Sequence, residues 1–518
     1  MSAPDFFPEL LAPAGNLEKL RTAFFYGADA VYLGGEAGES SLNLRAGCEG
    51  FGARELAEGL RTAKEHGGRV YYCLNSMPME QDMRHLPPVI EETASLGVDG
   101  FIIADPGVLR LARKYAPSVP VHLSTQANTT NGEAVRFWAE RGVSRVNLAR
   151  ELSFKEIEAV RQACPDVELE VFVHGAMCLA VSGQCLLSAW LNGRPANAGR
   201  CTQPCRFEYR PVTGMEEGGA GFEQPLDAGG EGGSGLEAMR GIPCTYTVEE
   251  RTRPGEPLWS VNREGAFTNI WAPDDLCLLP WLPWFIRMGI TALKIEGRMK
   301  GPGYVAHVVD VYGSALRTLR NAQRQGGDAS RPAGHAGEGV LREGRFAPQA
   351  AGQEVILSSE RDREVPETFA GWETYMPDLL YTASRPLGSG FFLPGGRRNL
   401  TEEFLSARGF SAGEAEASPF AFTAQPLLAK ITEPADGAGG SRGWRMEVRG
   451  AWRDGMAAEI MLPGMERPVL QPGSYALENH RGERVSSVGS GIRGVLHTDS
   501  PHVRPGCFVR AARTESKN

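Results

Sequence analysis

Short β-rich runs alternate with longer amphipathic segments through the first 175 residues, and this repeat limits the folds available to the chain. Helix-like stretches such as 16–26 and 53–66 separate seven runs that are apolar nearly throughout, at residues 9–13, 30–34, 69–75, 100–105, 121–126, 145–149 and 169–174. Strands of this kind between helices indicate a parallel sheet that is covered on both faces. Seven strand–helix units are more than a doubly wound sheet usually contains. We therefore predict an α/β fold, a (β/α)8 TIM-like barrel. Its eighth strand is expected at residues 291–296, after a helix-like stretch at 276–288.

The rest of the chain has a different composition. Residues 213–241 are rich in Gly and Glu, which predicts a flexible insertion in the barrel. A polar, Gly-rich stretch at 321–343 is expected to be a linker. Beyond it, Gly and Pro turns separate short β-like runs at 354–357, 390–393, 427–431, 444–448, 457–461, 494–496 and 507–509. We therefore predict a barrel over residues 1–320 and a smaller β-rich domain, barrel or sandwich, over residues 344–518.

Composition is that of a globular protein, with 42% hydrophobic and 23% charged residues. No long apolar run and no signal-peptide pattern stand in the sequence, so a cytoplasmic protein that does not enter a membrane is expected. The net charge of −9 is not typical of a nucleic-acid-binding protein. Residues 440–518 carry 12 Lys and Arg against 8 Asp and Glu. We interpret this excess as a mildly basic solvated face in preference to an RNA-docking surface.

Several of the predicted strands end in polar residues, and barrel enzymes place their chemistry at the carboxyl ends of the strands. Asp105 and Ser153 precede helix-like segments and are expected to cap them. Asn75, Gln126 and Glu296 fit capping less well. We predict that these three side chains face the barrel mouth and contact a substrate.

Four of the ten cysteines stand close together, as Cys178, Cys185, Cys201 and Cys205. Their spacing is wider than the C-x2–4-C pairs of common zinc sites. Iron–sulfur clusters need four thiolates and tolerate irregular spacing, because the ligands can come from different loops. Cys277, in the segment that leads back to the last strand, is a further candidate. Ordinary buried cysteines are the alternative, but four clustered thiols in a reducing compartment favour a metal or redox centre.

Glu170 and His174 are four residues apart on one predicted strand, and side chains alternate between the two faces of a strand. Both side chains are therefore expected on the same face, where they point into the barrel mouth and act in catalysis. A structural role for a single strand-end histidine is an equal alternative. The sequence has no HExxH zinc-protease motif. A peptidase that uses Cys178 with His174 stays open at this stage.

Several long motifs resemble those of peptidase family U32, the collagenase-like peptidases. They are EVFVHGAMCLAVSGQCLLS and NAGRCTQPCR around the cysteines, DLC and LKIEGRMK near the last strand, and ELLAPAGNLEKL and ADAVYLGG near the start. The resemblance extends from residue 8 to about residue 320.

The family name implies proteolysis, but better-understood members of the family are oxygen-independent hydroxylases with a [4Fe–4S] cluster. The resemblance implies Cys178, Cys185, Cys201 and Cys277 as the cluster ligands, with Cys205 as a cysteine that some members use in place of one of these. The insertion at 213–241 lengthens the usual spacing between the third and fourth ligands.

The resemblance also implies a substrate. Members act on the wobble uridine of tRNA, on a ribosomal RNA cytidine or on the ubiquinone ring, and the RNA-acting members are associated with prephenate as hydroxyl donor. The β-rich C-terminal domain resembles that of the longer, RNA-acting members, so tRNA is the expected substrate. Arg45, Lys294 and Arg298 are candidates for a clamp on the anionic donor. A structural salt bridge or a solvated cation is the alternative for each.

Three functions therefore follow from the sequence: an RNA hydroxylase, which is favoured, a U32-type peptidase, and a non-catalytic partner subunit that only holds a cluster. The oligomeric state is left open.

Overall fold

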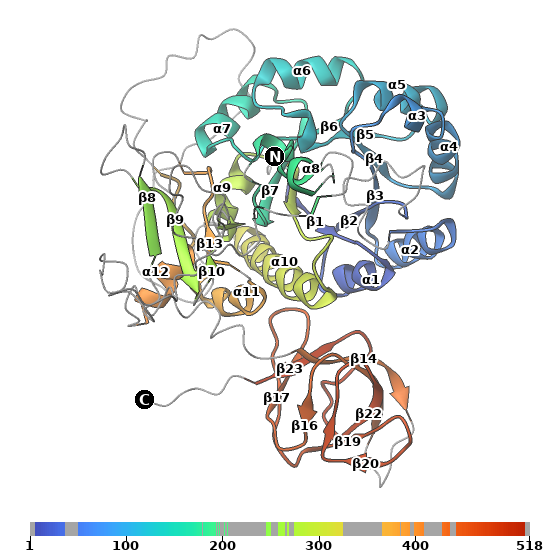
Figure 1. Cartoon of the computed structure of the whole chain (residues 1–518), viewed down its shortest axis with the longest axis vertical. Helices are drawn as coiled ribbons and strands as arrows, with labels where there is room; N and C mark the ends of the chain where they lie inside the picture. Colours follow the sequence, from blue (N-terminus) through green and yellow to red (C-terminus); the bar gives the residue numbers. More distant parts are fainter. Residues whose placement is uncertain are drawn as a thin grey trace, which may run out of the picture.

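A closed parallel barrel forms the first part of the molecule (Figure 1). The computed structural model describes residues 6–36, 50–178, 180–192, 194, 196, 201–202, 205, 245–249, 257–264, 267–268, 274–324, 365–383, 385–393, 398–408, 427–435 and 442–512. Arg45, the predicted insertion at 213–241 and all but the first four residues of the predicted linker lie outside these ranges.

Within the described residues, eight strands follow one another around the barrel, and the last pairs with both the first and the seventh. They are β1 (Glu9–Pro13), β2 (Ala30–Leu33), β3 (Arg69–Leu74), β4 (Gly100–Ile103), β5 (Val121–Leu123), β6 (Arg145–Asn147), β7 (Glu168–Gly175) and β12 (Ala292–Ile295). The predicted (β/α)8 barrel is confirmed. Each strand is buried almost throughout, since side chains fill the barrel on one face and helices cover the other.

The outer layer consists of α1 (Leu17–Phe25), α2 (Ala53–Glu65), α3 (Glu80–Met83), α4 (Leu86–Leu96), α5 (Pro106–Tyr115), α6 (Gly132–Glu140), α7 (Phe154–Ala163), α9 (Leu282–Arg287) and α10 (Pro302–Arg324). The predicted caps are confirmed: Asp105 accepts hydrogen bonds from two backbone N–H groups of α5, and Ser153 forms a capping box with Glu156 in α7. Among the described helices, none is both long and apolar enough to cross a membrane.

The chain between β7 and β12 departs from the regular repeat. It contains η2 (Val181–Gly183), α8 (Leu187–Asn192), a small antiparallel sheet of β8 (Thr245–Glu249), β9 (Pro257–Glu264) and β10 (Phe267–Thr268), then β11 (Asp275–Cys277) and η6 (Leu279–Trp281). The helix predicted at 276–288 therefore begins as a strand. β11 runs antiparallel to the end of β7, and this pairing fixes its first residues in extended form.

Residues 365–408, predicted to open the β-rich domain, instead belong to the barrel body. They form η8 (Trp372–Thr374), α11 (Met376–Thr382), β13 (Leu387–Gly388) and α12 (Leu400–Ser406), and β13 pairs with β11. Phe392 packs its ring against those of Trp281, Trp284 and Phe285, with centroids 5.3 to 5.4 Å apart. The predicted strand at 390–393 is wrong, since these residues form a turn from which Phe392 enters the aromatic cluster while Phe391 is exposed. The predicted run at 354–357 lies outside the described residues.

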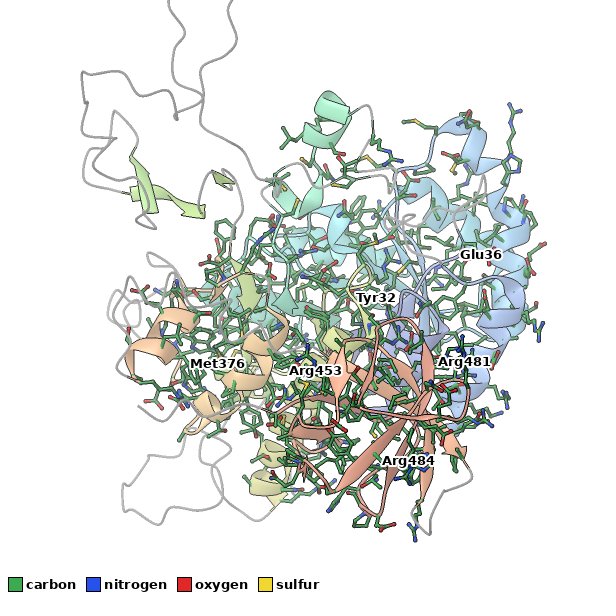
Figure 2. All side chains as sticks on the ribbon, turned by 60° about the horizontal axis from the view of Figure 1, so that its bottom comes forward. Tyr32, Glu36, Met376, Arg453, Arg481 and Arg484 are labelled. Atoms are coloured by element: carbon green, nitrogen blue, oxygen red, sulfur yellow. The ribbon has the colours of Figure 1, made fainter. Side chains whose placement is uncertain are left out.

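The β-rich part follows from residue 427 as an antiparallel sheet that curls around its own core (Figure 1). Its strands are β14 (Leu427–Ala435), β15 (Gly443–Val448), β17 (Ala458–Met461), β18 (Val469–Leu470), β19 (Tyr475–Glu478), β20 (Arg484–Val485), β22 (Arg493–Thr498) and β23 (Phe508–Ala511), with β16 (Trp452–Arg453) and β21 (Ser487–Val488) as a separate pair. The exposed side chains of Arg453, Arg481 and Arg484 all lie on this part (Figure 2).

Buried ion pairs join the β-rich part to α10 and α11. Arg467 contacts Asp310 at 2.7 Å and Asp378 at 3.2 Å, and Arg510 contacts Asp378 at 2.7 Å. Asp310 also accepts a hydrogen bond from the backbone N–H of Gly464 at 2.7 Å. Removing one member of such a network leaves a buried charge without its partner, so these contacts hold the two parts in one relative orientation.

His307 of α10 lies at this junction as a neutral imidazole. Its Nδ1 lies 2.7 Å from the carbonyl oxygen of Gly303 and donates to it, so Nε2 accepts from Arg510 at 3.0 Å. The ring stacks on Tyr381 at 4.7 Å, and Asp378 and Arg467 are the other charged groups near it. Burial and the neighbouring arginine lower the pKa of His307 from 6.5 to about 3.

We expect His307→Gln to reduce the loss of stability in mild acid. Because the folded-state pKa is depressed, the unfolded chain takes up a proton on this residue first as the pH falls below 6.5. With a folded-state pKa of about 3, protonation of His307 in the unfolded chain should lower the free energy of unfolding of wild type by about 2 kcal/mol between pH 7 and pH 5. The midpoint of thermal unfolding, measured at both pH values, should therefore change less in this variant than in wild type. His480→Gln, at an exposed histidine, serves as the control, and equal pH dependence in all three proteins would contradict the prediction.

Candidate functional site

A pocket opens at the carboxyl ends of the barrel strands, where the fold class predicts a site. It encloses about 870 Å³ of space continuous with solvent. Its walls come from seven of the strands or the turns that follow them and from the loop after β7: Tyr32, Cys73, Asn75, Ile102, Ser124, Thr125, Gln126, Asn147, Arg150, Phe172, Cys178, Gly183, Cys185, Leu187, Ala196, Cys201, Cys205, Lys294, Glu296 and Arg298. Tyr32 is labelled near the middle of the barrel in Figure 2.

Four cysteines line this pocket together, namely Cys178, Cys185, Cys201 and Cys205. All four are partly exposed, and none forms a disulfide. The segment that carries them is attached to the barrel at two points: the backbone N–H of Ser182 donates to Glu151 at 2.7 Å, and Gln184 Nε2 donates to the backbone oxygen of Gln126 at 2.8 Å. The thiols of Cys178 and Cys185 are thereby held over the barrel mouth, and the backbone N–H of Thr202, next to Cys201, donates to Ser188 Oγ at 3.0 Å.

The donor set in this pocket suits an iron–sulfur cluster. Within the described part of the chain, no three His, Cys, Asp or Glu side chains converge on a single ion. A cluster does not require such convergence, because each thiolate binds a different iron atom. An all-sulfur ligand set also selects soft metals and iron–sulfur centres over oxygen-binding cations.

Cys277 is not among the described residues that line the pocket. It is fully buried on the other side of β7, where its backbone pairs with His174. The hydroxyl of Tyr312, on α10, lies 3.8 Å from its sulfur. The structure therefore brings together three of the four predicted ligands and adds Cys205 to them.

His174 faces the helix layer and not the pocket. The register of β7 against β12 shifts between Phe172 and His174, so that the alternation of sides is broken at this point. The imidazole ring contacts Tyr304 and Tyr312 of α10, and burial lowers its pKa to about 3. The expectation that Glu170 and His174 share one face is wrong for this reason.

Glu170 does point into the barrel, but below the pocket. Its Oε1 accepts hydrogen bonds from Lys294 Nζ at 2.7 Å and from Asn147 Nδ2 at 2.8 Å. Arg145 lies 3.7 Å from Oε2 and is itself paired with Glu9 at the other end of the barrel. Since Lys294 and Asn147 both line the pocket, Glu170 orients two of its wall residues.

Arg298 offers an unused donor to the pocket. Its side chain is 3% exposed and lines the pocket, and Nη1 is buried with no hydrogen-bond partner among the described residues. Its backbone is held in place because Lys19 Nζ donates to its carbonyl oxygen at 3.0 Å. A buried guanidinium N–H without an acceptor is costly, so this group fits an anionic ligand.

The other predicted contact residues also reach the pocket. Asn75 donates to Ser124 Oγ at 3.2 Å, and both line the wall with Gln126 and Glu296. Sequence reasoning missed Asn147, the last residue of β6, whose Oδ1 is buried without a partner in the described part of the molecule. The available signal for it was a polar residue at the end of a predicted strand, in the run RVNLA.

Comparisons with known proteins agree on one family. The chain is 39% identical to tRNA hydroxylation protein P of Escherichia coli over 322 residues, which cover 60% of this chain and 68% of that protein. It is 39% identical to tRNA hydroxylation protein P1 of Bacillus subtilis over 305 residues, 59% of this chain and 62% of the relative. It is also 30% identical to a collagenase of Porphyromonas gingivalis over 332 residues, 62% of this chain and 68% of that protein. The model of peptidase family U32 matches residues 15–336, and the chain belongs to that family.

Proposed function

We propose that this chain is an RNA hydroxylase that transfers a hydroxyl group to a base of tRNA, the wobble uridine, with a [4Fe–4S] cluster as cofactor and prephenate as donor. The observation that carries the proposal is the coincidence, in one pocket, of four cysteines and a buried arginine with an unused donor. The names of the two tRNA hydroxylation relatives and of a 23S rRNA 5-hydroxycytidine synthase of Escherichia coli, 36% identical over 209 residues, support it.

In this proposal Cys178, Cys185 and Cys201 hold the cluster, and Cys205 supplies the fourth thiolate. The position of Cys205 in the same pocket wall supports this choice over Cys277. When bound there, such a cluster would supply one-electron or Lewis-acid chemistry to the pocket.

The protein's own side chains would bind and orient the donor. Prephenate carries two carboxylates; Arg298 and Lys294 both line the pocket, and Arg298 Nη1 is buried without a hydrogen-bond partner among the described residues. Asn75 and Gln126 line the same pocket, and their amides would contact the donor hydroxyl. The net reaction would exchange groups: the base loses a hydrogen and gains a hydroxyl, and the donor loses the hydroxyl and gains a hydrogen, so that the base is oxidised by two electrons and the donor reduced by two.

A peptidase is less well supported. The nucleophile and base of such an enzyme have to lie within hydrogen-bond reach of each other. Cys178 lines the pocket, whereas His174 contacts Tyr304 and Tyr312 behind β7. The name collagenase belongs to one relative, and the pair that the peptidase alternative requires here, Cys178 and His174, is not brought together.

The proposal is tested with protein purified anaerobically and incubated with unmodified tRNA and prephenate. We expect one tRNA nucleoside to gain the mass of one oxygen atom with wild type and no such product with Cys178→Ala. Gelatin is added to parallel samples. Cleavage of gelatin that Cys178→Ala abolishes, without any change in tRNA, would favour the peptidase. Modification of tRNA only when a second protein is added would indicate a partner subunit.

A further inference from the structure

Exposed apolar side chains surround the mouth of the pocket. Met77, Met79, Val181, Leu186 and Met299 are 48% to 75% exposed, and we call these five the apolar rim. They are half of the large hydrophobic residues that are exposed in the described part of the chain. Single exposed apolar residues are ordinary, but a concentration around one opening indicates a contact surface.

Each part of the rim stands next to the pocket wall in sequence. Met77 follows Asn75 by two residues, Leu186 follows Cys185 directly, and Met299 follows Arg298 directly. The rim therefore comes from three separate loops, after β3, β7 and β12. Because β7 and β12 are paired neighbours in the closed barrel and β3 lies across from them, these loops lie on two facing sides of the same opening.

The rim loops are held by hydrogen bonds. The backbone N–H of Met79 donates to Asp82 at 2.6 Å, and the loop of Val181 and Leu186 is tied to the barrel through Ser182 and Gln184. The loop of Met299 is fixed by the contact of Lys19 with the backbone oxygen of Arg298. The rim side chains are thus exposed on loops whose backbone is held in place by hydrogen bonds.

The combination of an apolar rim with a polar pocket wall matches the chemistry of an unstacked base. A base presents an apolar face to its neighbours and a polar edge for hydrogen bonds. Proteins that take a base out of its stack place apolar side chains against the neighbouring bases. The rim residues come from three separate loops and do not form one continuous strip of chain, which suits individual base faces better than a continuous lipid or protein surface.

We propose that the apolar rim packs against the bases that flank the target base, so that an RNA loop is held open over the pocket. This inference rests on the proposed function and adds the way in which the RNA is recognised. Met side chains, which form three of the five positions, adapt to surfaces of irregular shape. Recognition of this kind would favour a single-stranded loop over a duplex, since stacked bases do not offer their faces.

The test compares Leu186→Ser and Met299→Ser with Phe137→Ser, which removes an exposed apolar side chain on α6, away from the mouth. Each protein is prepared anaerobically, and its affinity for unmodified tRNA is measured over a series of salt concentrations. We expect each rim variant to bind about fivefold more weakly, because part of one side chain's apolar burial is lost. The salt dependence and the iron content should stay as in wild type, because no phosphate contact is removed. Phe137→Ser should bind like wild type.

The outcomes separate this inference from the proposed function. If wild type neither binds nor modifies tRNA, the proposed function fails and the rim inference fails with it. If wild type modifies tRNA and the rim variants bind it like Phe137→Ser, the inference alone is overturned. If wild type sediments as a dimer that Leu186→Ser dissociates with unchanged tRNA affinity, the rim is covered by a second copy and the inference is also overturned.

Discussion

Cys205→Ala is expected to abolish cluster binding, whereas Cys277→Ala is expected to leave it intact. Cys205 lines the pocket with Cys178, Cys185 and Cys201. Cys277 would have to leave the far side of β7 to join them. That movement would break its strand pairing with His174 and the hydrogen bond of 2.8 Å from the backbone N–H of Leu278 to Val173. A cluster that loses one of four thiolates loses a covalent ligand to iron, so the effect on iron content should be close to complete.

The measurement is iron and sulfide analysis together with the visible absorption spectrum, on variants reconstituted anaerobically. Wild type and Cys277→Ala should hold about four iron atoms per chain, and Cys205→Ala should hold few. Cys507→Ala is the matched control, because Cys507 is a fully buried cysteine in the β-rich part. Its unfolding midpoint shows what loss of a buried thiol does to stability alone. Loss of iron in Cys277→Ala but not in Cys205→Ala would reverse the assignment and restore the ligand set implied by the family resemblance.

The barrel could be predicted from the sequence because its signals are local. The run at residues 69–75 is apolar and β-rich, and the structure has β3 at Arg69–Leu74. Capping residues such as Asp105 and Ser153 mark helix starts through hydrogen bonds to their own neighbours. Seven repeats of such local signals identify the architecture even where a boundary differs by a residue.

The errors come from interactions between distant segments. The direction of His174 depends on a register shift between β7 and β12, whose partners are more than 100 residues apart in the chain. The turn around Phe392 is fixed by the aromatic rings of Trp281 and Phe285, and not by its own sequence. Periodicity gives the side of a strand only while the alternation is unbroken.

The sequence was sufficient to predict most of the residues that line the pocket, but not which cysteines come together there. Asn75, Gln126, Lys294, Glu296 and Arg298 all line the pocket, as expected for polar residues at strand ends. Sequence spacing does not tell whether Cys205 or Cys277 is the fourth cysteine of the pocket, because both follow Cys201 in the chain. The pairing of β11 with β7 places Cys277 away from the pocket, whereas Cys205 lines it. The roles of these residues stay predictions.

Arg298→Met is expected to weaken donor binding strongly and to leave the cluster in place. The substitution keeps most of the side-chain volume and removes the buried guanidinium, whose Nη1 has no acceptor among the described residues. Hydrogen bonds to charged groups contribute about 1.5–3 kcal/mol each, so loss of a paired contact to a carboxylate should raise the KM for prephenate about 100-fold. The effect on kcat should be smaller if the arginine binds the donor equally before and during the reaction.

The measurement is steady-state hydroxylation of tRNA at varied prephenate concentration, with iron content determined on the same samples. Arg298→Lys should recover part of the affinity, because it keeps the charge but not the two-pronged geometry of the guanidinium. Lys300→Met is the control, because Lys300 is a cationic residue near Arg298 that is not among the described residues lining the pocket. If this substitution has an effect, it should change the affinity for tRNA and the salt dependence of that affinity, and not the KM for prephenate. A normal KM for prephenate in Arg298→Met, together with a lowered unfolding temperature, would mean that the arginine serves the fold of the loop after β12 and that the donor is bound by other groups.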